Sequence, residues 1–136
     1  MGDTRIILET YIQGWKKRDH KLKTLKSNRL NQARKILPDI IDILKKYHVK
    51  KIILFGSLVD INHFRLHSDI DIAVEGLDPK RFFEAYGEIM SAIDFPVDLK
   101  PIEKLEPFFK QRIMTYGEII YDTKRTAHRA GFGDSE

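Results

Sequence analysis

The chain has 136 residues and a formal net charge of +4. It contains no cysteine, which excludes disulfides and thiolate-bound metals, and no apolar run reaches the roughly 20 residues that a membrane-spanning helix needs. We therefore expect a single domain with no membrane partner. Charged residues interrupt the apolar runs near the N-terminus, so we expect no cleaved signal and a cytoplasmic location.

The first third of the chain predicts helices. Apolar residues recur at helical spacing over residues 4–15, and a second, longer pattern covers residues 22–47. Pro38 is expected to kink or restart this second helix, because proline lacks an amide donor and its ring clashes with the preceding turn. Residues 1–48 are thus predicted to form an N-terminal helical extension packed on the core.

This extension carries a concentrated positive charge. Between positions 16 and 35 the only acid is Asp19, which leaves a local excess of +8. The basic residues are Lys16, Lys17, Arg18, Lys21, Lys23, Lys26, Arg29, Arg34 and Lys35. A cationic segment favours a partner with phosphates or carboxylates, although a solvated helix face gives the same pattern. Because no aromatic residues lie between the lysines, a nucleic acid is the weaker choice of direct partner.

Strands and helices alternate in the remainder of the chain. Residues 51–55 predict a buried strand that ends at Gly56, a polar loop follows, and residues 69–74 predict a second strand. Asp78 and Pro79 open a helix that continues to residue 94, residues 97–100 form a third strand, residues 105–116 another helix, and residues 119–121 an edge strand. This order indicates an α/β domain with a small mixed sheet.

Two aromatic-rich stripes are expected to face the core. They lie on the helices after residue 78 and after residue 105. The first comprises Phe82, Phe83, Tyr86, Ile89, Met90 and Ile93, and the second comprises Phe108, Phe109, Ile113 and Tyr116.

Three acidic residues are expected on one exposed face of the sheet. Asp69 and Asp71 flank Ile70, so in a strand their side chains point the same way while the isoleucine enters the core. Asp98 alternates in the same manner with its apolar neighbours on the third strand. Crowded carboxylates repel one another unless a cation lies between them, and Mg²⁺ suits such ligands.

A glycine-serine turn precedes these acids. Gly56 lets the backbone approach an anion closely, and the N–H groups that follow it favour phosphate. With the acids, this turn predicts a place that holds a metal-bound triphosphate.

The spacing of these motifs resembles that of a known superfamily. Phe55-Gly56-Ser57 is followed by eleven residues, then by Asp69-Ile70-Asp71, and later by Val97-Asp98-Leu99. This pattern is similar to the DNA polymerase β-like nucleotidyltransferases, and more narrowly to the minimal nucleotidyltransferases (MNT) of bacteria and archaea. The resemblance implies a nucleotidyltransferase fold, with a small mixed sheet flanked by helices, over residues 49–122. Residues 123–136 are expected to be a disordered tail.

The resemblance also implies roles for these residues. Gly56 and Ser57 would hold the β- and γ-phosphates of ATP, and Asp69 and Asp71 would bind Mg²⁺. Asp98 would help to hold a second Mg²⁺ ion and would draw the proton from the attacking hydroxyl.

The pattern departs from the superfamily just after the turn. Leu58-Val59 stands where many relatives have an arginine and a small residue. Arg65 and Lys100 are our candidates to supply the missing phosphate-binding cation, and His63 or His67 could also do so.

The acceptor is implied by the same resemblance. Minimal nucleotidyltransferases are commonly the antitoxins of HEPN/MNT pairs and transfer AMP from ATP to a tyrosine of the HEPN ribonuclease toxin. The chain would then be a protein adenylyltransferase, and its basic N-terminal region would dock the toxin. Three alternatives remain: an antitoxin that acts by binding alone, a nucleotidyltransferase that modifies a small molecule or RNA, and a nucleic-acid-binding module.

Overall fold

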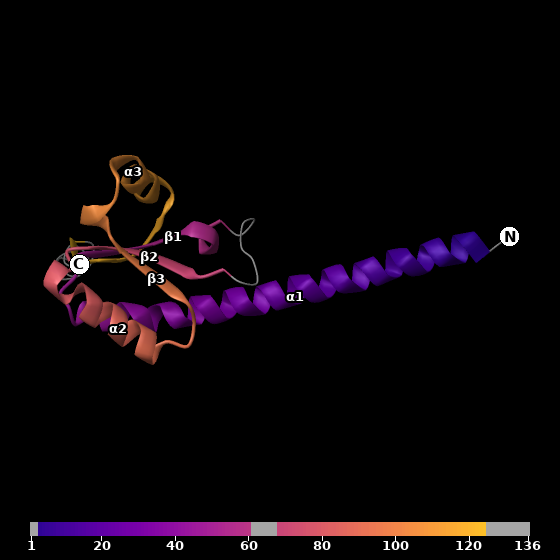
Figure 1. Cartoon of the computed structure of the whole chain (residues 1–136), viewed down its shortest axis with the longest axis horizontal. Helices are drawn as coiled ribbons and strands as arrows, with labels where there is room; N and C mark the ends of the chain where they lie inside the picture. The colour runs from indigo at the N-terminus through magenta and orange to yellow at the C-terminus, as the bar shows by residue number, and fades with distance from the viewer. Residues whose placement is uncertain (1–2, 61–67, 125–136) are drawn as a thin grey trace, which may run out of the picture.

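The computed structural model describes residues 3–60 and 68–124, and its elements form a four-stranded sheet with helices on both faces (Figure 1). The helices are α1 (Asp3–Lys45), α2 (Phe82–Ala92) and α3 (Pro107–Tyr116), with short 3₁₀ turns η1 (Gly56–Leu58), η3 (Pro79–Arg81) and η4 (Ile102–Lys104). The strands are β1 (Lys51–Phe55), β2 (Ile70–Glu75), β3 (Val97–Pro101) and β4 (Glu118–Asp122).

The strand order is β3-β2-β1-β4. β1 pairs antiparallel with β2 and β4, whereas β2 and β3 are parallel and are joined through α2. A parallel pair needs such a crossover, which is why a helix follows β2 directly. The small mixed sheet and the edge strand at residues 119–121 confirm the predicted fold.

The two faces of the sheet carry separate apolar clusters. The C-terminal half of α1 and α2 cover one face, where the buried side chains include Ile40, Leu54, Ile72 and Ile89. On the other face, α3 places Ile113 against a smaller cluster that includes Ile53 and Ala73. Because this cluster is small, α3 leaves one end of the second face of the sheet uncovered, where polar side chains are accessible to solvent.

Helix α1 differs from the prediction. It runs as one helix from Asp3 to Lys45 with Pro38 inside it. Leu37 and Ile40 beside it are buried on the sheet, and this burial offsets the cost of a proline inside a helix, about 3 kcal/mol for the lost hydrogen bond and the ring clash together.

The extension is packed on the core only in part. From Ile6 to Leu25 every apolar side chain of α1 is exposed, and Figure 1 shows this half of the helix projecting beyond the rest of the molecule. An apolar stripe on a helix indicates a covered face, but here only the stripe from Ala33 onward has a surface to cover it.

Several aromatic residues expected in the core are instead exposed. Phe83 is 84% exposed, because it lies about 200° around α2 from the buried Ala85. Met90 on α2 is also exposed, as are Phe108 and Tyr116 on α3. Both helices bury only a narrow stripe, since each rests on a small sheet.

No helix in the described parts of the chain is both long enough and apolar enough to cross a membrane. Arg65, His63 and His67 lie outside the described residues, as does most of the predicted tail. Thr123 and Lys124 are described, and the Thr123 backbone N–H donates to the Lys50 carbonyl at 2.9 Å.

The two halves of α1 should respond differently to the same truncation. Ile40→Ala removes a fully buried side chain and should lower the free energy of unfolding by about 3 kcal/mol. Leu22→Ala, on the projecting half, should change it by less than about 0.5 kcal/mol. Urea unfolding followed by circular dichroism measures both values. A large loss for Leu22→Ala would mean that the projecting half packs on the domain in solution.

Candidate functional site

Three carboxylates lie at the uncovered end of the α3 face of the sheet. Asp71 on β2 is aligned with Phe55 on β1 and with Asp98 on β3. Asp69 stands just before β2, and the burial alternation of the strand sends Ile70 and Ile72 into the opposite face. The strand register therefore brings together the three acids that the sequence singled out.

The pKa of Asp71 reflects both its burial and its two acidic neighbours. Its pKa is raised to about 6, mainly because the carboxyl is partly buried and further because Asp98 and Asp69 repel a charge there. Lys100 acts in the opposite direction and lowers the pKa of Asp71. Its ammonium lies 3.2 Å from a carboxylate oxygen of Asp98. One lysine thus faces a group of three acids, which leaves negative charge in excess.

The glycine-serine turn lies directly against this charge. Gly56 has φ +75°, a conformation that L side chains rarely adopt, and a Cβ at this position would lie 2.3 Å from Oδ2 of Asp71. The positive φ therefore favours glycine at position 56, and any larger residue would also have to displace the carboxylate of Asp71. The turn continues as η1, in which Ser57 is half-buried and Leu58 anchors the segment in the core.

Two of the nine basic residues between positions 16 and 35 contact segments of the site. Arg34 donates to the carbonyl oxygen of Leu58 at 3.1 Å and pairs with the Glu118 carboxylate at 3.2 Å. Arg29 donates to the carbonyl of Ser68 at 3.4 Å, and its guanidinium stacks 4.2 Å from the centroid of the Phe95 ring. The sequence pattern gave no reason to separate these two arginines from the other seven cations.

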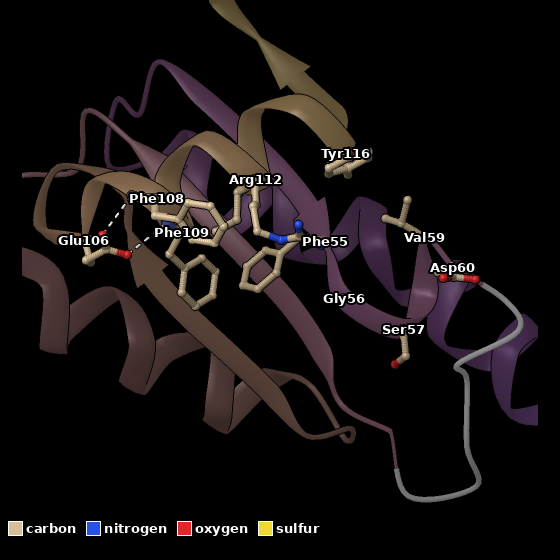
Figure 2. A pocket seen from close by; sticks show the side chains of 12 residues that line it. Phe55, Gly56, Ser57, Val59, Asp60, Glu106, Phe108, Phe109, Arg112 and Tyr116 are labelled. Carbon is tan, nitrogen blue, oxygen red and sulfur yellow. Dashed lines mark hydrogen bonds between the residues drawn. The ribbon is translucent and has the colours of Figure 1, made fainter.

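A groove of about 1000 Å³ adjoins the turn. One end is formed by Gly56, Ser57 and Asp60, and α3 supplies a wall that includes Phe109 and Arg112 (Figure 2). The rings of Phe55 and Phe109 meet edge to face with centroids 5.9 Å apart. The groove is mostly apolar with a few polar groups at one end, which is the usual character of a small-molecule site.

Aromatic residues of α3 that were expected in the core line the groove instead. Phe108 and Tyr116 are exposed because they line this groove, as the labels in Figure 2 show. Arg112 lies between them on α3, with its guanidinium 5.2 Å from the centroid of the Tyr116 ring. Among the described residues Arg112 forms no ion pair. No role for Arg112 was predicted from the sequence, where its only signal is a cation within an otherwise apolar stripe.

The donor set suits a hard divalent cation. Asp69, Asp71 and Asp98 supply only carboxylate oxygens, and the pKa of Asp71 is raised first by burial and then by the charges of the other two acids. Within the described ranges no three His, Cys, Asp or Glu side chains are arranged to hold a metal among themselves. Mg²⁺ usually takes one or two carboxylates and completes its shell with water and phosphate oxygens.

Comparisons with known proteins agree with this geometry. Residues 38–126 match the family model described as polymerase beta, nucleotidyltransferase. No curated protein sequence matches the chain. Among solved structures, a toxin–antitoxin complex with AMP-PNP contains a chain that is 32% identical, with 64% of this chain and 73% of that chain covered and a TM-score of 0.53.

Two further solved structures are similar. A tri-AMPylated HEPN toxin in complex with an MNT antitoxin from Shewanella oneidensis gives 28% identity over 67% of this chain and 73% of that chain, with a TM-score of 0.50. The toxin–antitoxin complex MntA–HepT gives 29% identity over 65% and 72%, with a TM-score of 0.50. These findings confirm the resemblance that the motifs indicated. The chain therefore belongs to the polymerase beta nucleotidyltransferase family, and within that family it is similar to the MNT antitoxins solved with HEPN toxins.

Proposed function

We propose that this protein transfers AMP from ATP to a tyrosine hydroxyl of a HEPN toxin and thereby acts as the antitoxin of that toxin. The observation that carries the proposal is Asp71, held between Asp69 and Asp98 and pressed against the Gly56 turn. The solved relatives add that one such complex binds AMP-PNP and that another contains an AMPylated HEPN toxin.

Each part of the site has a place in this reaction. The backbone of Gly56 and the hydroxyl of Ser57 bind the β- and γ-phosphates, and Lys100 adds a cation beside them. Asp69 and Asp71 would hold Mg²⁺, which neutralises phosphate charge when it is bound. Asp98 takes the proton of the tyrosine hydroxyl. The tyrosine oxygen then forms a bond to the α-phosphorus, the bond from that phosphorus to the bridging oxygen breaks, and pyrophosphate leaves.

The groove beside the turn gives the rest of the nucleotide a place. A base in the groove would meet the exposed ring of Phe109 and the guanidinium of Arg112, both of which can stack on a planar base. The triphosphate would then reach Gly56 and Ser57 at the end of the same groove. We assign Phe109 and Arg112 to nucleotide binding on this basis.

The first test is transfer itself. Incubation of the protein with ATP, Mg²⁺ and the HEPN protein encoded beside it should add the mass of AMP to a tyrosine-containing peptide of that protein. Asp69→Asn with Asp71→Asn should reduce the rate at least 1000-fold, because it removes the charge that balances the phosphates and their cation. Tandem mass spectrometry of the toxin measures the modified fraction.

The same pair of substitutions separates catalysis from binding. Neutralisation of the toxin should be lost with the double variant, whereas Asp39→Asn with Asp42→Asn, far from the site on α1, should preserve it. Neutralisation that survives the loss of transfer would show that the antitoxin acts by binding alone. Modification of RNA or a small molecule in place of the toxin would contradict the proposed acceptor.

The raised pKa of Asp71 predicts a stability change that needs no substrate. The pKa in the folded chain lies above that of an unfolded aspartate, so the ionised carboxylate destabilises the fold at pH above about 6, and the penalty disappears as the pH falls toward 4. Asp71→Asn should therefore stabilise the protein by about 1 kcal/mol at pH 7.5, a value reduced for partial solvent exposure, and by almost nothing at pH 4.5. Urea unfolding in chelator measures the difference. An equal effect at both pH values would contradict a raised pKa for Asp71 in the folded chain.

Arg112 should contribute to ATP affinity. Arg112→Ala should weaken ATP binding about tenfold, as expected for the loss of one charge-assisted or stacking contact. Lys110→Ala removes the same charge from α3 outside the groove and should change affinity less than twofold. Isothermal titration calorimetry with ATP and Mg²⁺ measures the ATP affinity of both variants. Equal effects of the two substitutions would mean that only the overall positive charge matters.

A further inference from the structure

The projecting half of α1 has a surface that the domain does not use. We call residues 4–28 of this helix the arm. At about 1.5 Å per residue the arm is about 37 Å long. It carries seven cations against two carboxylates, and exposed apolar side chains line it from Ile6 to Leu25. The family model covers residues 38–126 and so does not include the arm.

The apolar residues of the arm lie in line with those that α1 buries against the sheet from Ala33 onward. We call this line of residues the stripe. Leu8, Trp15 and Leu22 are seven residues apart, which is close to two helical turns, and Ala33 follows Leu22 after eleven residues, close to three turns. They therefore lie on the face of α1 that is buried from Ala33 onward. Trp15 is nevertheless 62% exposed. The helix thus presents to solvent the same face that covers the sheet elsewhere.

The arm starts at the candidate site. Arg34 and Arg29 bind the backbone of Leu58 and Ser68, which border the turn and the double aspartate. Beyond these contacts the helix passes the end of the sheet at which η1 lies, as Figure 1 shows. A protein seated on the stripe would therefore lie beside the opening of the nucleotide site.

The positive charge of the arm favours an acidic protein over a second copy of this chain as the partner. Each arm has a net charge of +5, seven cations against two carboxylates, so a second copy seated on the stripe in either direction would bring like charge to like charge. Self-association through the stripe is thus opposed by repulsion. An acidic protein surface with an apolar strip matches both features, since it neutralises the lysines and covers Leu8, Trp15 and Leu22.

We infer that the arm docks the acceptor protein of the transfer reaction, through an acidic surface on that protein with an apolar strip at its centre. The inference rests on the proposed function and goes beyond it, because it assigns acceptor capture to a segment outside the nucleotidyltransferase domain. Docking along the arm would raise the concentration of the acceptor hydroxyl near the α-phosphate without any change in nucleotide binding.

The test compares two charge-matched variants of the full chain. Trp15→Glu with Leu22→Glu alters the stripe, whereas Gln13→Glu with Thr24→Glu adds the same two charges on the opposite side of the arm. All four positions are exposed, so both variants should fold, which circular dichroism verifies. Calorimetry should show at least 30-fold weaker binding of the HEPN protein by the stripe variant and less than threefold weaker binding by the control. Binding of ATP to either variant alone should equal that of the parent.

The outcomes separate the inference from the proposed function. If the parent binds and modifies the HEPN protein and the stripe variant does so equally well, the inference is overturned and the proposed function stands. If the parent neither binds nor modifies it, both fail. If sedimentation shows a dimer of the parent that the stripe variant loses, or if RNA binds the arm with a steep salt dependence and the acceptor does not, the arm has another occupant and the inference is overturned.

Discussion

The site depends on the crowding of like charges at one end of a small sheet. Asp71 has neighbours of its own sign on two sides, and Gly56 approaches so closely that even a methyl group would not fit. Such a group of carboxylates is costly to the fold, and Lys100 offsets the repulsion only in part. The fold remains stable despite this repulsion because the larger core lies on the opposite face of the sheet. Binding of a cation together with a phosphate would relieve the repulsion.

The helices leave the aspartate-bearing end of the sheet accessible. α3 is short and covers only the middle of its face, through Ile113, so the strand ends beyond it remain accessible and a groove forms beside them. α1 covers the other face and reaches around to the turn through Arg34. One helix therefore supports the core and also fixes the segment proposed to receive phosphate.

Much of the fold and part of the site could be predicted from the sequence. Alternation around Ile70 and Leu99 placed the acids on one face, and the register of parallel β2 and β3 set Asp71 beside Asp98. Local periodicity shows which face of a segment is apolar, but it does not show what covers that face. For this reason Phe83 and Tyr116 were expected in the core although their side chains are exposed.

The groove and the arginine contacts depend on tertiary placement. Arg29 and Arg34 acquire their roles only because α1 crosses the end of the sheet near Ser68 and Leu58. In the same way, Arg112 lines a groove only because α3 lies beside the Gly56 turn. No spacing of residues within one helix encodes such a relation between segments that are distant in the chain.

The continuity of α1 gives the molecule a mechanical property. The helix runs without interruption from Asp3 past Arg29 and Arg34, so the projecting end and the arginines beside the turn lie on one continuous rod. A tilt of about 5° around Arg34 would move the far end by about 4 Å, given a rise of about 1.5 Å per residue. Immobilising that distant end would therefore also restrict the small angular fluctuations of the turn.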